Sequence, residues 1–164
     1  MLACVDVAYR GDRARAACLV FPHWRSAEPL RVLKASLEQV APYEHGAFYK
    51  RELPCLLAVL SRVAVHLEAV VIDGYVWLAD GSVPGLGAHL YEALRGGSAI
   101  IGVAKTSYRD DRCSLPVLRG SSQRPLFVTA AGLAPEAAAA AIRAMHGEGR
   151  IPTLLRRVDR ACRG

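Results

Sequence analysis

Two short and almost entirely apolar segments limit the folds that this chain can adopt. Residues 69–73 read AVVID and residues 98–103 read SAIIGV. Segments of this length without polar alternation are typical of central strands that are buried on both faces of a sheet. Apolar residues at helical spacing precede each segment, in residues 46–63 and 85–94. This order predicts parallel strands joined by crossover helices that cover the sheet.

The first 36 residues predict three further strands. Leu2–Arg10 alternates apolar and polar residues, and Gly11 and Asp12 form a turn signal. Strands over Ala14–Phe21 and Leu30–Ser36 follow, with a proline-bounded loop between them. Because the connections are short, we expect these three strands to pair in antiparallel fashion.

The remainder of the chain completes one α/β domain over residues 1–164. Short strands are predicted at residues 115–118 and 126–129, and a helix is predicted over Pro135–Met145, with proline in its first turn. The tail from Gly149 onward is basic. The expected fold is a mixed sheet, with three antiparallel strands followed by parallel βαβ strands, flanked by helices.

Charge and cysteine content narrow the class of protein. No apolar stretch approaches the roughly 20 residues that a membrane span needs, and Asp6 and Arg10 interrupt the region where a secretory signal would need an apolar core. The net charge is +6, and only three of the 21 basic residues are lysines. An arginine-rich surface fits a polyanionic partner, although a general alanine and arginine bias explains the same composition equally well.

The five cysteines form no CxxC pair, and their number is odd. Cys4, Cys18 and Cys55 lie inside apolar runs, so we interpret them as small buried side chains rather than as disulfides or metal ligands. This use of cysteine is typical of a reducing compartment, and we expect a cytoplasmic protein.

Three carboxylates stand in positions that suggest chemistry. Asp6 lies within the apolar first strand, Asp73 ends the buried segment AVVID, and Glu52 lies in the helix between them. A carboxylate on a central strand is costly to bury unless it pairs with a cation or binds a metal. Oxygen ligands of this kind suit Mg²⁺ or Mn²⁺. Such an ion could activate water and stabilise the charge that builds on a phosphodiester.

Each acid also has an ordinary structural interpretation. Glu52 could be a solvated helix residue or a partner of Arg51 or Arg62. Asp73 could form a turn or cap a helix, and an arginine could satisfy Asp6. The metal-site hypothesis draws its weight from the three acids together.

Lys105 and Tyr43 are the other candidates for function. Lys105 follows the second buried segment, where it could neutralise a scissile phosphate, or it could be a surface lysine paired with a carboxylate. Pro42 and Tyr43 precede the first helix in a loop that also contains Gly46. An aromatic side chain exposed there could stack on a base or wedge into a duplex, whereas core packing is the plainer alternative.

Around these residues the sequence resembles the endonuclease V family, the deoxyinosine 3′ endonucleases. The similarity extends over nearly the whole chain, and its segments run in the family's order. They are VDVAY at 5–9, PYEHGAF at 42–48, RELP at 51–54, VIDG at 71–74, GLGAHL at 85–90, IGVAK at 101–105, GRIP at 149–152 and RVD at 157–159.

The resemblance implies an RNase H-like fold and Mg²⁺-dependent cleavage of a DNA or RNA strand near hypoxanthine. It implies that Asp6, Glu52 and Asp73 bind the metal and that Lys105 neutralises phosphate. It also implies that the loop with Pro42, Tyr43 and Gly46 contacts nucleic acid and holds the strands apart, although Glu44 and His45 replace the usual Ile-Pro of that wedge.

Two departures from the family pattern support an alternative. Tyr75 stands where the family motif DGHG has histidine, and residues 128–134 lack the histidine of the family's VSPGHRIS. The alternative is a catalytically weakened or inactive relative that binds nucleic acid or a protein. Retention of the three acids and Lys105 favours the enzyme.

Overall fold

The apolar segments form the centre of a seven-stranded sheet in the computed structural model, which describes residues 1–164. The strand order is β3-β2-β1-β4-β7-β9-β8. The strands of this sheet are β1 (Leu2–Arg10), β2 (Arg13–Phe21), β3 (Arg31–Leu37), β4 (Ala69–Asp73), β7 (Ala99–Ala104), β8 (Leu115–Val117) and β9 (Leu126–Ala131). A separate short hairpin consists of β5 (Trp77–Leu78) and β6 (Val83–Pro84).

The pairing of the strands confirms the predicted mixed sheet. Strands β1, β2 and β3 are antiparallel neighbours, and β1, β4 and β7 run parallel to one another. Strands β9 and β8 complete the sheet in antiparallel pairing. Strand β9 continues two residues beyond the predicted end, because Ala130 and Ala131 still pair with β7.

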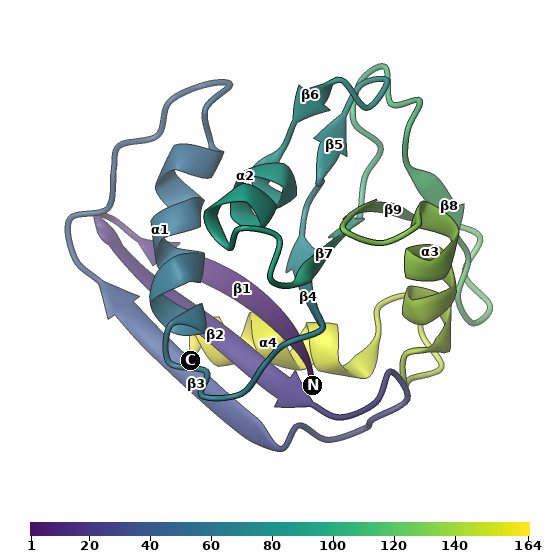
Figure 1. The fold of residues 1–164 in the computed structure, drawn as a ribbon, viewed down its shortest axis with the longest axis horizontal. Helices are drawn as coiled ribbons and strands as arrows, with labels where there is room; N and C mark the ends of the chain where they lie inside the picture. The colour runs from purple at the N-terminus through teal and green to yellow at the C-terminus, as the bar shows by residue number, and fades with distance from the viewer.

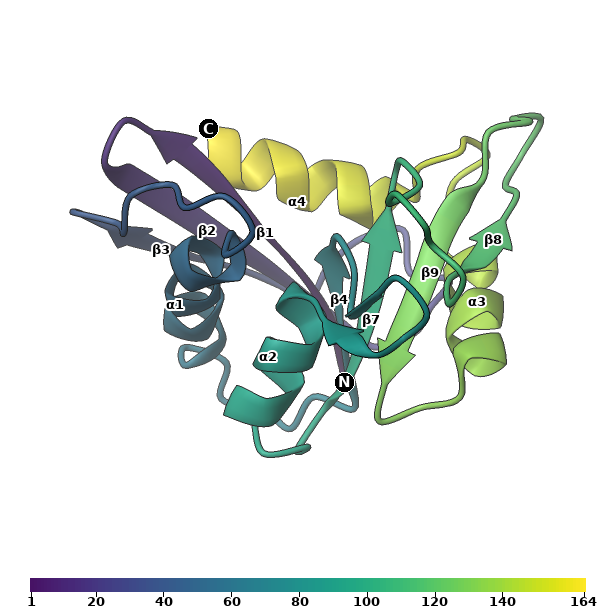
Figure 2. The same cartoon turned by 90° about the horizontal axis from the view of Figure 1, so that it is seen from above.

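Four helices cover the two faces of the sheet (Figures 1 and 2). They are α1 (Tyr49–Leu60), α2 (Leu86–Ala93), α3 (Pro135–Ala144) and α4 (Thr153–Arg163). One apolar cluster joins α1 and α2 to one face, and a second joins α3 and α4 to the other. Helix α1 is shorter than predicted, since Gly46 adopts a left-handed conformation before it and a turn follows Leu60. None of these helices is long and apolar enough to cross a membrane.

Helix α4 is the main element that the sequence analysis missed. Leu154, Val158 and Cys162 recur every four residues and are buried against the sheet. The remaining positions carry many arginines, so the sequence indicates only a basic tail. The consequence is that α4 packs across β1 and brings Asp159 to the same region as Asp6.

Candidate active site

The register of the three parallel strands brings Asp6, Asp73 and Lys105 to one edge of the sheet. Val5 pairs with Ile72, so Asp6 and Asp73 follow side by side, and Asp73 pairs with Val103, two residues before Lys105. All three side chains line one small cavity of about 30 Å³, which is closed by residues of α4. This is the carboxyl end of parallel strands, where α/β sheets bind ligands.

Asp73 and Lys105 form an ion pair. Lys105 Nζ donates to Asp73 Oδ2 at 2.7 Å, and both side chains remain almost half exposed. Partial burial opposes protonation of the lysine, but the bond to Asp73 and the nearby acids outweigh it and raise the pKa of Lys105. The lysine is therefore held as a cation beside the acids, where a phosphate could approach it.

Asp6 is largely buried and has no cationic partner. Its Oδ1 accepts a hydrogen bond from the backbone N–H of Val7 at 2.8 Å, and no ion pair includes it. Burial raises the pKa of Asp6 to about 6, against the effect of the Val7 bond, and the charges of Asp73 and Asp159 add to the rise. The arginine partner considered from the sequence is not present.

Glu52 lies on α1, on the other face of the sheet, and it belongs neither to the cavity of Asp6, Asp73 and Lys105 nor to the cluster of close ligand atoms around Asp6. Its side chain is buried and takes part in no hydrogen bond or ion pair. Burial is the main cause that raises the pKa of Glu52 to about 8, and the charges of Asp6 and Asp73 contribute to the same rise. Arg51 instead donates to the Gly11 carbonyl, and Arg62 donates to the Lys34 carbonyl, so neither neutralises Glu52.

Helix α4 contributes two groups to which the sequence assigns no role, although Asp159 belongs to the RVD segment of the family resemblance. One ligand atom from each of Asp6, Asp159 and Cys162 lies within 4.8 Å of the others. Burial, followed by the charges of the two acids, raises the pKa of Cys162 to about 12, so the thiol stays protonated. Only the four-residue apolar spacing of the tail could have indicated that Asp159 faces the sheet.

The loop before α1 exposes the residues proposed to contact nucleic acid. Pro42, Tyr43 and Gly46 are all exposed, and Tyr43 retains 61% of its accessible surface. The Tyr43 ring meets Phe48 edge-on, with 6.1 Å between centroids. Core packing is therefore the wrong interpretation of Tyr43, and its role in binding stays a prediction.

Tyr75 has a structural role at the position where a histidine was expected. Its hydroxyl donates to the Thr106 carbonyl and accepts from the Tyr108 N–H, each at 2.9 Å. These bonds fasten the segment after Lys105 to the end of β4. The tyrosine thus orders the loop beside the acids.

Comparison with known proteins gives a consistent result. The family model described as Endonuclease V matches residues 1–147, and the match ends before α4. Among solved structures, an endonuclease V from Streptomyces avermitilis is 30% identical, with a TM-score of 0.77, covering 99% of this chain and 79% of that one. No curated protein sequence matches this chain.

Two more distant structures share the fold. Endonuclease V from Ciona intestinalis, solved with a 24-mer DNA that contains an inosine followed by a ribo-adenosine, is 16% identical with a TM-score of 0.82, covering 99% of this chain and 84% of that one. Endonuclease V from Bacillus subtilis is 17% identical with a TM-score of 0.75, covering 98% and 77%.

Proposed function

The chain belongs to the endonuclease V family, and we propose that it is a metal-dependent endonuclease that cleaves a phosphodiester near hypoxanthine in DNA or RNA. The observation that carries this proposal is that Asp6, Asp73 and Lys105 line one cavity at the edge of the sheet. The charges of Asp6 and Asp73 also act on buried Glu52. A structural role would pair each buried acid with its own cation, whereas Asp6 and Glu52 have none.

The donor set fits a hard divalent cation such as Mg²⁺ or Mn²⁺. Burial without a cationic partner, and after it the repulsion between the acids, raises the pKa values of Asp6 and Glu52. Asp159 offers a further carboxylate oxygen close to Asp6. The protonated Cys162 is a poor ligand, so oxygen donors dominate, as these two ions prefer.

The residues around such an ion have distinct roles. Asp6 and Asp73 are proposed as direct ligands, with Glu52 as a ligand or as the group that orients the attacking water. When bound, the ion would lower the pKa of water and offset charge on the phosphodiester. Lys105 is already positioned by Asp73 and would neutralise the phosphate.

Nucleic-acid binding is proposed for the loop of Pro42, Tyr43 and Gly46. Gly46 has a φ of +78°, a conformation that a side chain would strain, and this turn leads the chain into α1. The exposed ring of Tyr43 would stack on or between bases beside the lesion. The five cysteines are free thiols, and we propose a location in the reducing cytoplasm.

Cleavage of a labelled oligonucleotide that contains one inosine tests the proposal. DNA and RNA versions are incubated with Mg²⁺ or Mn²⁺, beside Asp73→Asn and, as a charge-matched control, Glu92→Gln on the exposed surface of α2. We expect metal-dependent nicking that Asp73→Asn abolishes and Glu92→Gln retains.

The alternative, a catalytically weakened or inactive binding module, is favoured by the structural use of Tyr75. Binding of the inosine oligonucleotide without metal-dependent nicking in any of the proteins would reject the enzyme and support that module.

A further inference from the structure

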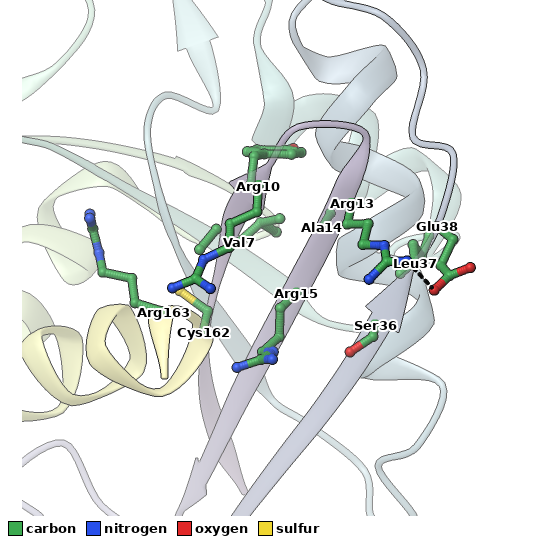
Figure 3. A pocket seen from close by; sticks show the side chains of 12 residues that line it. Val7, Arg10, Arg13, Ala14, Arg15, Ser36, Leu37, Glu38, Cys162 and Arg163 are labelled. Carbon is green, nitrogen blue, oxygen red and sulfur yellow. Dashed lines mark ion pairs between the residues drawn. The ribbon is translucent and has the colours of Figure 1, made fainter.

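A basic groove lies next to the acids, between the β1–β2–β3 part of the sheet and the end of α4 (Figure 3). Its volume is about 820 Å³. The charged side chains that line it are Arg10, Arg13, Arg15, Glu38 and Arg163, and Cys162 lines it as well. We propose that this groove binds the phosphate backbone of the nucleic-acid strand that leads away from the cleavage site. The inference deepens the proposed function and rests on it.

The arginines of the groove floor project from one face of the sheet. Arg10 pairs directly with Arg13 across β1 and β2, and Arg15 pairs with Ala8 two positions further along. Residues that pair across strands, or that lie two apart on one strand, share a face. Figure 3 shows the side chains of Arg10 and Arg15 extending over the sheet toward the end of α4.

This arrangement is unfavourable without an anionic partner. Like charges directly opposite one another destabilise a strand pair. Glu38 is the one acidic side chain among the lining residues, and it pairs with Arg13 at 3.6 Å. Arg10 and Arg15 take part in none of the ion pairs or side-chain hydrogen bonds of the structure and are exposed. Two guanidinium groups are therefore free to bind phosphate, which they match in geometry and charge.

The groove lies next to the candidate active site. Cys162 lines the groove, and its sulfur lies within 4.8 Å of ligand atoms of Asp6 and Asp159. Ala8, two residues beyond Asp6 on β1, lines it as well. A strand cut at the acids would thus meet Arg10 and Arg15 on one side of the cut. The position of these two arginines next to the acids fits a polyanionic strand that extends from the acids into the groove.

Binding measured without cleavage tests the groove. Fluorescence anisotropy in the presence of a chelator gives the affinity for labelled inosine oligonucleotides over a range of salt concentrations. The variant Arg10→Gln with Arg15→Gln removes the two free charges, and Arg10→Lys with Arg15→Lys retains them. The matched control is Arg95→Gln with Arg143→Gln, two exposed arginines beyond α2 and on α3 that make no side-chain bonds.

We expect the glutamine variant to bind several-fold more weakly. The slope of log affinity against log salt concentration should decrease in magnitude by about 1.4 on single strands and about 1.8 on duplexes. These values correspond to the loss of two phosphate contacts. The lysine variant and the control should keep a larger share of the slope, with the control close to the unsubstituted protein. The decrease in affinity should also be confined to oligonucleotides in which the strand continues beyond the inosine on one particular side.

The outcomes separate this inference from the proposed function. If the glutamine variant keeps the affinity and slope of the control while the unsubstituted protein cleaves with metal, the groove is rejected and the nuclease stands. If the slope decreases as expected but no protein cleaves, the groove stands and the nuclease is rejected. If the unsubstituted protein neither binds nor cleaves, both are rejected.

Discussion

Glu52 and Asp6 are the acids of the candidate site whose pKa values are raised, above all by burial. Both acids hold protons more tightly in the folded chain than at their ordinary pKa values of 4.5 and 3.8. A raised carboxyl pKa means that the folded state binds more protons than the unfolded state. Stability therefore decreases as pH rises through the interval between the ordinary and the folded pKa. A bound divalent cation would remove this cost.

This linkage predicts a pH-dependent effect of metal on stability. Between about pH 6 and about pH 8 the metal-free protein should lose thermal stability as Glu52 ionises, and saturating Mg²⁺ or Mn²⁺ should restore it. Thermal unfolding with and without metal measures the difference, which we expect to grow with pH. Glu52→Gln should flatten the metal-free pH dependence. If metal raised the unfolding temperature by the same amount at both ends of this pH range, the account would be contradicted.

Lys105 gives a second prediction at the residue scale. Replacement by glutamine removes the cation that Asp73 holds at 2.7 Å, so charge on the reacting phosphate would lose one stabilising partner. We expect the single-turnover cleavage rate to decrease by about 100-fold, with little change in oligonucleotide affinity. A substitution at Lys34, on the surface of β3, provides the matched control. A decrease in affinity that accounts for the whole rate loss would contradict this role.

At the scale of elements, Arg119 connects the outer strands to α4. Its buried guanidinium donates to the carbonyls of Met145, Gly147 and Gly149 in the segment between α3 and α4. The buried apolar residues of α4, spaced four apart, pack this helix against β1. This packing places Asp159 beside Asp6. The position of one acid therefore depends on a hydrogen-bond network at the far end of its helix.

Arg119→Met tests this dependence. The substitution leaves several carbonyls without a donor, so we expect unfolding free energy to decrease by about 1–3 kcal/mol. Urea denaturation measures that change. Arg124→Met, an exposed arginine in the neighbouring turn, is the control. Equal stability of the two variants would show that the network does not hold this segment.

The sequence predicts best those elements whose apolar residues form an uninterrupted or regularly spaced pattern. The apolar segment at residues 69–73 has the same bounds in sequence and structure. The position of Asp6 beside Asp73 follows from the pairing of β1 with β4, which the sequence does not specify. Helix α4 was missed because many arginines obscure its apolar stripe. The burial of Glu52 could not be predicted, since it depends on how Cys55, Leu56 and Val59 seat α1 against the sheet.

At the scale of the whole molecule, one sheet carries both the proposed metal site and the proposed phosphate-binding groove. Its parallel centre holds Asp6 and Asp73. Its antiparallel β1–β2–β3 part carries the arginine groove that Figure 3 shows. The net charge of +6 is thus partly concentrated where a polyanion would pass. Association with nucleic acid should accordingly weaken as ionic strength rises.

The most direct test of the central claim is a Mn²⁺ titration followed by electron paramagnetic resonance. If the acids of β1, α1 and β4 form one site, the unsubstituted protein should bind Mn²⁺ at that site, and Asp6→Asn and Asp73→Asn should each abolish this binding. The control Glu92→Gln should leave it unchanged. Binding that persists undiminished in both aspartate variants would contradict the claim that these side chains share one cation.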